Sequence, residues 1–124
     1  RPDFALLVYP VIDMGAHAHA GSRSRLLGAQ PSAGLEAQFS LQTQVNAKTP
    51  PTFLVHAQDD NVVPVQNSLL YYQALLDAGV PSEMHLFPHG GHGFGVRIPE
   101  ALTTTQWTGL ALRWMQAQAG EAAP

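Results

Sequence analysis

The chain has 124 residues, of which 45% are hydrophobic and 12% charged, and its net charge is −3. This charge, with no run of basic residues, argues against nucleic acid as a partner. The absence of cysteine excludes disulfides, thiolate metal ligands and a cysteine nucleophile within the chain, and no apolar run approaches the roughly 20 residues that a membrane span needs.

The first predicted element is a strand over residues 4–11, an apolar run that ends at Pro10. A strand that is apolar on both faces is typical of the middle of a parallel sheet, with helices on both sides. We therefore expect further strands to come from residues that precede this chain. On this interpretation, residues 1–124 are the C-terminal portion of a single larger domain.

The next stretch, residues 13–49, is irregular and rich in glycine, serine, proline and glutamine. Short helices are predicted over residues 22–27 and 35–38, with Ser32 capping the second. A long irregular stretch in a compact domain is more often functional than accidental, so we interpret it as a long active-site loop.

The remaining elements alternate between strands and helices. A strand is predicted over residues 52–57, then a helix that begins at Pro64 or Val65 and stops at Gly79, then a strand over 82–87 and a final helix over 101–117. This alternation favours an α/β fold, with parallel strands, right-handed crossovers and flanking helices. The apolar faces of the two helices are predicted to be Leu69, Leu70, Tyr72, Leu75 and Leu76 in the first, and Trp107, Leu110, Ala111, Trp114 and Met115 in the second.

Two strands are each followed by residues that suit acid–base chemistry. Asp59 and Asp60 come just after the strand 52–57, and His92 lies in a glycine-rich loop after the strand 82–87. Because parallel strands present their carboxyl ends at one edge of the sheet, a carboxylate and an imidazole can meet there. An acid followed by a histidine is the order of the last two members of a Ser-Asp-His triad. Asp60, four residues before Pro64, is the better candidate for the acid; the alternative is that both aspartates are turn formers and His92 is structural.

No serine in the chain occupies the Gly-x-Ser-x-Gly pattern of a nucleophile elbow. The six serines are more simply interpreted as caps, turn residues and surface hydroxyls: Ser22, Ser24, Ser32, Ser40, Ser68 and Ser82.

Three segments resemble the acetyl-xylan and feruloyl esterase-like carboxylesterases of the α/β-hydrolase superfamily, relatives of dienelactone hydrolases and prolyl oligopeptidases. They are PTFLVHAQDDNVVPVQNS at residues 51–68, the stretch 79–95 that ends in GGHGFG, and HAGSR with LLG at 19–28. The resemblance implies that Asp60 is the triad acid and His92 the triad base. It also implies that the serine and the oxyanion hole lie before this chain begins.

The function implied by this resemblance is that of a serine carboxylesterase that hydrolyses small acyl esters, on a carbohydrate or another alcohol, without a cofactor. The 124 residues alone are expected to be inactive. If a two-chain assembly supplies the missing portion, the chain in isolation is expected to expose an apolar edge over residues 4–9 and to self-associate. Three alternatives stay open: a prolyl-oligopeptidase-like peptidase, a dienelactone hydrolase, and a non-catalytic binding module of the same fold. The sequence is compatible with a cytoplasmic or an exported bacterial protein.

Other residues of interest have simpler interpretations beside functional ones. His19 is a candidate substrate-binding residue by the resemblance, or a solvated loop histidine. Phe94 either flanks the substrate pocket or anchors its loop. His56, at the end of a buried strand, is expected to be a packed, hydrogen-bonded core histidine. Two spaced histidine pairs in separate loops do not provide the three or four converging ligands of a metal site, so no metal is expected.

Overall fold

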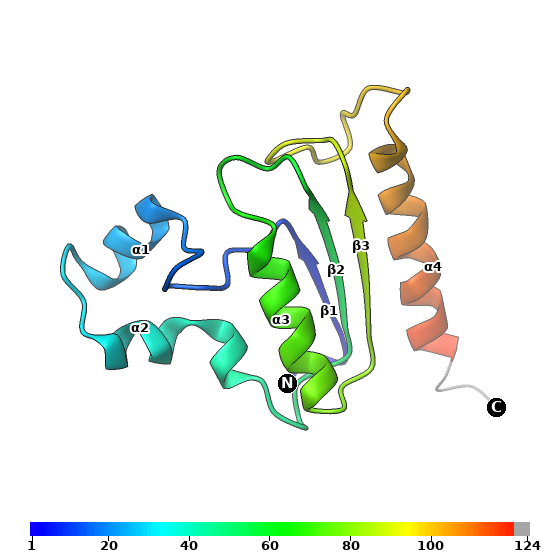
Figure 1. Ribbon diagram of the computed structural model, residues 1–124. Helices are drawn as coiled ribbons and strands as arrows, with labels where there is room; N and C mark the ends of the chain where they lie inside the picture. Colours follow the sequence, from blue (N-terminus) through cyan, green and yellow to red (C-terminus); the bar gives the residue numbers. More distant parts are fainter. Residues whose placement is uncertain (121–124) are drawn as a thin grey trace.

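The computed structural model describes residues 1–120, which form a three-stranded sheet with helices around it (Figure 1). The strands are β1 (Ala5–Val8), β2 (Thr52–Ala57) and β3 (Ser82–Phe87). The helices are α1 (Ala20–Leu27), α2 (Ala33–Phe39), α3 (Gln66–Asp77) and α4 (Trp107–Gly120), with short 3-10 helices η1 (Leu41–Gln44) and η2 (Thr103–Gln106).

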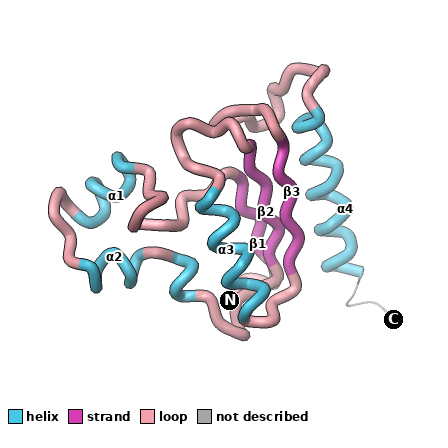
Figure 2. Tube along the Cα trace, viewed as in Figure 1, coloured by secondary structure: helices cyan, strands magenta, loops and turns pink. Residues whose placement is uncertain are grey.

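The sheet is parallel throughout, in the order β1-β2-β3. Ala5 pairs with Thr52 and Thr52 with Ser82, so the three strands start level and their carboxyl ends lie at one edge. In Figure 2 the loops that follow β2 and β3 meet at that edge. This arrangement confirms the predicted α/β fold and puts the two chemically interesting loops side by side.

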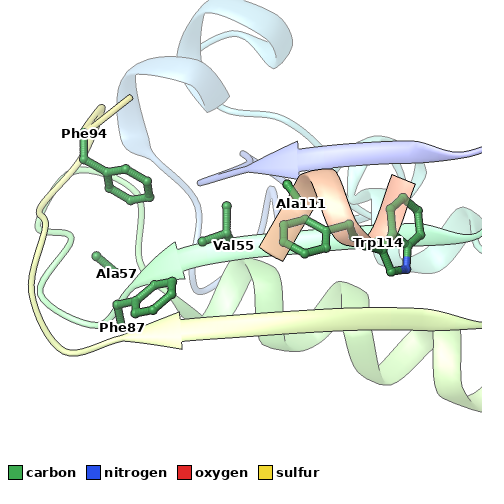
Figure 3. Close-up of a cluster of buried hydrophobic side chains, with 7 residues drawn as sticks. Val55, Ala57, Phe87, Phe94, Ala111 and Trp114 are labelled. Carbon is green, nitrogen blue, oxygen red and sulfur yellow. The ribbon is translucent and has the colours of Figure 1, made fainter. Parts of the chain in front are cut away.

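Two hydrophobic clusters hold the helices to the sheet. Successive residues of β2 point to opposite faces, and all six are buried. On one face, Leu54 packs with Leu75 of α3, the helix drawn in front of the sheet in Figure 1. The cluster on the other face, shown in Figure 3, includes Ala111 and Trp114 of α4. Its other buried members are Phe53, Val55, Ala57, Phe87 and Phe94.

β1 is shorter and less buried than the sequence predicts. It covers residues 5–8 in place of 4–11, because the backbone of Tyr9 turns to a φ of +40° and Pro10 follows. All four of its residues are only half-buried, and no described strand pairs with its outer edge. The strand expected at the middle of a sheet is thus an edge strand among residues 1–120, and its further neighbours stay a prediction.

The residues between β1 and β2 contain more helix than predicted but keep the predicted cap. The side chain of Ser32 accepts a hydrogen bond from the backbone N–H of Leu35 at 3.2 Å and so caps α2. Arg23 of α1 forms an ion pair with Glu36 of α2, which joins these two helices. In Figure 1 they lie together at the left of the sheet.

The predicted apolar face of α3 is wrong in part. Leu75 is buried, but Leu69 and Leu76 are 41% and 52% exposed. The buried face also includes the polar residues Asn67 and Ser68, whose side chains bond to neighbouring loops and to β2. For α4 the predicted face is confirmed, although the α-helix begins at Trp107, after η2, and not at Ala101. Among residues 1–120, no helix is both long and apolar enough to cross a membrane.

Candidate active site

The turn after β2 holds the Asp60 carboxylate through its own backbone. Oδ1 of Asp60 accepts hydrogen bonds from the N–H groups of Val62 at 2.9 Å and Val63 at 2.8 Å. Aspartate commonly forms such turns by bonding to residues just downstream. The side chain is fully buried, so the carboxylate has a fixed position and its second oxygen faces the loop that follows β3.

That second oxygen contacts the imidazole of His92. Nδ1 of His92 lies 2.8 Å from Oδ2 of Asp60, and the His92 side chain is 30% exposed. Burial alone would raise the pKa of Asp60, but the hydrogen bonds from His92, Val63 and Val62 hold that pKa below its ordinary value. Asp60 is therefore a carboxylate that orients the imidazole by accepting from Nδ1, and Nε2 is left for other chemistry.

His56 contacts the same carboxylate from below the turn. It is fully buried, as expected for a core histidine, and its Nδ1 lies 2.7 Å from Oγ of Ser68. Its Nε2 lies 2.9 Å from the carbonyl oxygen of Val63 and 3.2 Å from Oδ2 of Asp60. Sequence reasoning identified the burial of His56 but missed its contact with Asp60.

Tyr9 lies against the opposite side of the site and was also missed. Its ring centroid is 4.9 Å from that of His92 and 4.9 Å from that of Phe94. Its φ of +40° is rare for a residue other than glycine, and rarer still just before a proline. The backbone N–H of Tyr9 donates to the carbonyl of Val55 at 2.8 Å, which fixes this turn on the end of β2.

Three hydrogen bonds from other parts of the chain hold the loop that carries His92. The Gly91 N–H donates to Oδ1 of Asp59 at 2.7 Å, and this hydrogen bond is the largest cause of the lowered pKa of Asp59. The Thr104 hydroxyl donates to the carbonyl of His89, and Nε1 of Trp107 donates to the carbonyl of Gly95 at 2.8 Å. Asp59 is thus a loop-binding carboxylate, not the partner of His92.

The buried side-chain amide of Asn67 links the start of the β1–β2 connection to the turn that carries Asp60. Oδ1 of Asn67 accepts from the N–H groups of Ile12 and Asp13 at 2.9 and 2.8 Å. Its Nδ2 donates to the carbonyls of His17 and Pro64 at 2.8 and 2.9 Å. All four hydrogen-bonding positions of the amide are used. The first residues of the predicted active-site loop are therefore fixed beside the site, while α1 and α2 extend away from it.

The two predicted substrate-binding residues have clear structural contacts. His19 is the N-cap of α1, where its Nδ1 accepts from the N–H of Ser22 at 3.2 Å and lies 2.8 Å from Oγ of the same residue. Phe94 is 8% exposed and packs edge-on against Tyr9, as an anchor of its loop would. A role for either residue in substrate binding stays a prediction. Residues 1–120 hold no group of three or more His, Cys, Asp or Glu side chains arranged around a possible metal ion.

The serines lie elsewhere, each with other partners. Ser40 and Ser68 are buried and bond to Asp13 and His56, and the remaining four bond within their own turns and caps. Among the described residues, none of these hydroxyls lies within hydrogen-bond distance of His92. The site can accept a proton at Nε2 of His92 and stabilise the resulting imidazolium through Asp60, and no serine hydroxyl among residues 1–120 is placed to donate that proton.

Comparison with known proteins identifies relatives of this arrangement. The model of the prolyl oligopeptidase family matches residues 3–122. The crystal structure of an acetyl ester-xyloside bifunctional hydrolase from Caldicellulosiruptor lactoaceticus is 47% identical in sequence, with a TM-score of 0.89, over 94% of this chain and 43% of that one.

Two curated proteins show similar identity over shorter shares of their length. Endo-1,4-beta-xylanase B of Butyrivibrio fibrisolvens is 42% identical over 88% of this chain and 17% of its own. An acetylxylan esterase of Xylanibacter ruminicola is 39% identical over 77% of this chain and 21% of its own. The chain thus spans about a fifth of the length of these curated relatives and less than half of the similar crystal structure.

Proposed function

This chain belongs to the prolyl oligopeptidase family and has an α/β-hydrolase fold, and on that premise we propose that it is the acid-and-base portion of a serine carboxylesterase. The observation that carries the proposal is the 2.8 Å contact between Nδ1 of the half-exposed His92 and the buried carboxylate of Asp60. The two residues follow adjacent parallel strands, at the edge of the sheet where α/β enzymes bind ligands.

In the proposed reaction, a serine from a preceding portion of the same domain attacks the carbonyl carbon of an ester. Nε2 of His92 takes the proton of the serine hydroxyl and passes it to the departing alcohol, which leaves an acyl-enzyme. His92 then takes a proton from water, whose oxygen attacks the acyl group, and the serine regains its proton as the acid departs. Asp60 holds the imidazole in the Nδ1–H tautomer and stabilises its charged form. These steps require no cofactor.

The substrate class is proposed to be small acyl esters, including acetyl groups on a carbohydrate. Two relatives at 39% and 47% identity are named acetylxylan esterase and acetyl ester-xyloside bifunctional hydrolase, which supports an ester over a peptide substrate. We further propose that residues 1–124 are one portion of a single hydrolase domain. The half-buried, unpaired edge of β1 supports further strands there, and the same portion would supply the serine elbow and the oxyanion hole.

The proposal is tested by labelling the complete gene product with a fluorophosphonate and measuring intact masses. We expect one adduct on a polypeptide heavier than the 13.3 kDa of this chain, together with hydrolysis of acetylated xylan or of an aryl acetate. The matched control is His92→Ala in the same polypeptide, which should label far more slowly because the serine loses its base.

Two outcomes would contradict the proposal. An adduct on one of the six serines of this chain would mean that the nucleophile lies within this chain and not in a preceding portion of the domain. A folded complete product that neither labels nor hydrolyses esters would leave a non-catalytic binding module as the better interpretation.

A further inference from the structure

His56 is a buried histidine whose two ring nitrogens are both bonded within the chain. The side chain is fully buried between the end of β2 and the first turn of α3. Nδ1 faces the hydroxyl of Ser68 at 2.7 Å, and Nε2 faces the carbonyl of Val63 at 2.9 Å and Oδ2 of Asp60 at 3.2 Å. Nε2 carries at most one hydrogen, so a hydrogen bond from it is shared between the carbonyl of Val63 and the carboxylate that holds His92.

The surroundings of the ring indicate which nitrogen carries the proton. Both groups near Nε2, the carbonyl of Val63 and the carboxylate of Asp60, can only accept hydrogen bonds. Nε2 must therefore be the donor, and in a neutral ring Nδ1 accepts from the hydroxyl of Ser68. The two acceptors thus fix the tautomer in which His56 donates toward Asp60, and the Ser68 hydroxyl, which can donate or accept, is compatible with it.

With His56 included, the Asp60 carboxylate accepts four hydrogen bonds. Oδ1 takes the N–H groups of Val62 and Val63, and Oδ2 is shared between Nδ1 of His92 and Nε2 of His56. A carboxylate oxygen that accepts a second donor has less charge to offer the first, so the strength of the Asp60–His92 hydrogen bond depends on His56.

We propose that His56 is a positioning residue for the catalytic pair: it fixes the Asp60 carboxylate in orientation and shares Oδ2 with His92, so that the Asp60–His92 hydrogen bond depends on it. This inference rests on the proposed esterase function, in which Asp60 and His92 are the acid and base. The other titratable groups around His92 are Tyr9 at the end of β1, His89 in its own loop and Asp59, which is bound to that loop.

The test uses two amide replacements of His56 in the complete, serine-containing gene product. A glutamine amide reaches the place of Nε2, so His56→Gln retains a donor to Asp60. An asparagine amide reaches only the place of Nδ1, so His56→Asn keeps a partner for Ser68 and loses that donor. Both replacements substitute a polar amide for the ring and lose its packing. A difference between the two variants therefore reports the hydrogen bond to Asp60.

The readouts are the melting temperature and the pH profile of kcat/KM. With His56→Asn we expect kcat to fall about tenfold or more through misplacement of the pair, and the acidic limb to move up by about half a pH unit. His56→Gln should keep the limb of the parent enzyme. Ser68→Ala, which removes a hydrogen bond on the far side of the ring, should lower the melting temperature and leave the limb within about 0.2 of a pH unit.

Two results would overturn the inference. One is an acidic limb in His56→Asn that stays in place while kcat falls only in step with thermal stability, as a purely structural role predicts. The other comes from nitrogen NMR of the histidine-labelled parent protein, which needs no variant to fold: a proton on Nδ1 and none on Nε2 would exclude the bond to Asp60. Failure of the proposed function is distinct, because the parent would then hydrolyse no ester, or Asp60→Asn and His92→Ala would retain its full activity.

Discussion

At the scale of single residues, the candidate site is governed by how hydrogen bonds offset burial. Asp60 has no exposed side-chain surface, which on its own would favour the neutral acid. The bonds from His92, Val62 and Val63 reverse this preference and lower the pKa of the carboxyl group. A carboxylate that is ionised at neutral pH and fixed in place is what a general-base histidine requires from its partner.

Replacing Asp60 by asparagine tests that role directly. The new amide can keep an oxygen toward the turn, but its NH₂ group would face Nδ1 of His92 and favour the wrong tautomer. We expect kcat of the complete enzyme to fall about 10⁴-fold, because in the wrong tautomer Nε2 carries a proton and cannot act as the base. Circular dichroism should show a native fold. Turnover within tenfold of the parent would exclude Asp60 as the acid.

The lowered pKa values also predict how stability depends on pH. Burial would raise the pKa of Asp13, but hydrogen bonds from Gln42, His17, Gly15 and Ser40 hold it below the ordinary value of 3.8. A carboxyl group with a lowered pKa in the folded state stabilises the fold above its unfolded pKa. That contribution is lost as pH falls through the folded value. The free energy of unfolding should therefore decrease as the pH is lowered below about 4.

Asp13→Asn provides the comparison for this prediction. Denaturant unfolding from pH 6 to pH 2 should show a shallower decrease in the variant than in the parent, because one of the responsible carboxyl groups no longer titrates. Parallel curves would mean that Asp13 titrates alike in the folded and unfolded states.

Some of these residues were accessible to sequence reasoning and others were not. The strand alternation puts His56 on the same face as Leu54, toward α3, so its burial could be expected. Its contact with Asp60 depends on how the turn folds back, which no local pattern specifies. The φ of Tyr9 could not be foreseen because every local preference opposes it.

At the scale of elements, the loop after β3 shows how a flexible sequence becomes rigid. Four of its glycines adopt positive φ: Gly90, Gly91, Gly93 and Gly95. Only at Gly90 is the space around the missing side chain also filled. A Cβ there would lie 3.2 Å from Cδ1 of Phe94, 3.3 Å from Cγ2 of Thr104 and 3.4 Å from Cβ of Ala57.

Gly90→Ala is therefore expected to displace this loop. The strained φ of +151° and the three close contacts should together cost about 1–3 kcal/mol of stability, and kcat should fall as His92 moves away from Asp60. The control is Gly34→Ala in α2, where the space is open and the φ ordinary, and where alanine should stabilise by about 0.5–1 kcal/mol. Equal melting temperatures for both variants would contradict the argument.

The helices show the limit of periodicity as a guide. In α3 the leucine spacing predicted a stripe through Leu69 and Leu76, yet both are largely exposed. A helical period says which residues share a face but not which face meets the sheet. In α4 the two aromatic anchors, Trp107 and Trp114, left less ambiguity, and the predicted face was confirmed.

At the scale of the whole molecule, the described sheet has two strands with an unpaired edge. β2 is buried along its full length, whereas β1 and β3 each pair on one side only. β1 consists of four apolar residues that are only half-buried, and such an edge readily pairs with another chain.

The 124 residues expressed alone are accordingly expected to self-associate. Sedimentation velocity should show dimers or larger species whose share grows with concentration. In the complete gene product, we propose that further strands cover β1. This product should therefore form species with fewer copies of the polypeptide at the same concentration. A strictly monomeric isolated chain would contradict the prediction that β1 is an interior strand of the full domain.

The register of the sheet has a consequence for the order in which this protein folds. Thr52 pairs with Ser82, 30 residues further along the chain and connected through α3, while its pairing with Ala5 spans 47 residues. Since loop closure becomes less favourable with chain separation, the β2-α3-β3 unit should form early in the folding transition state and β1 should dock late. That early unit includes His56 and the loops that carry Asp60 and His92. The Asp60–His92 pair would therefore be assembled before β1 docks and brings Tyr9 against His92.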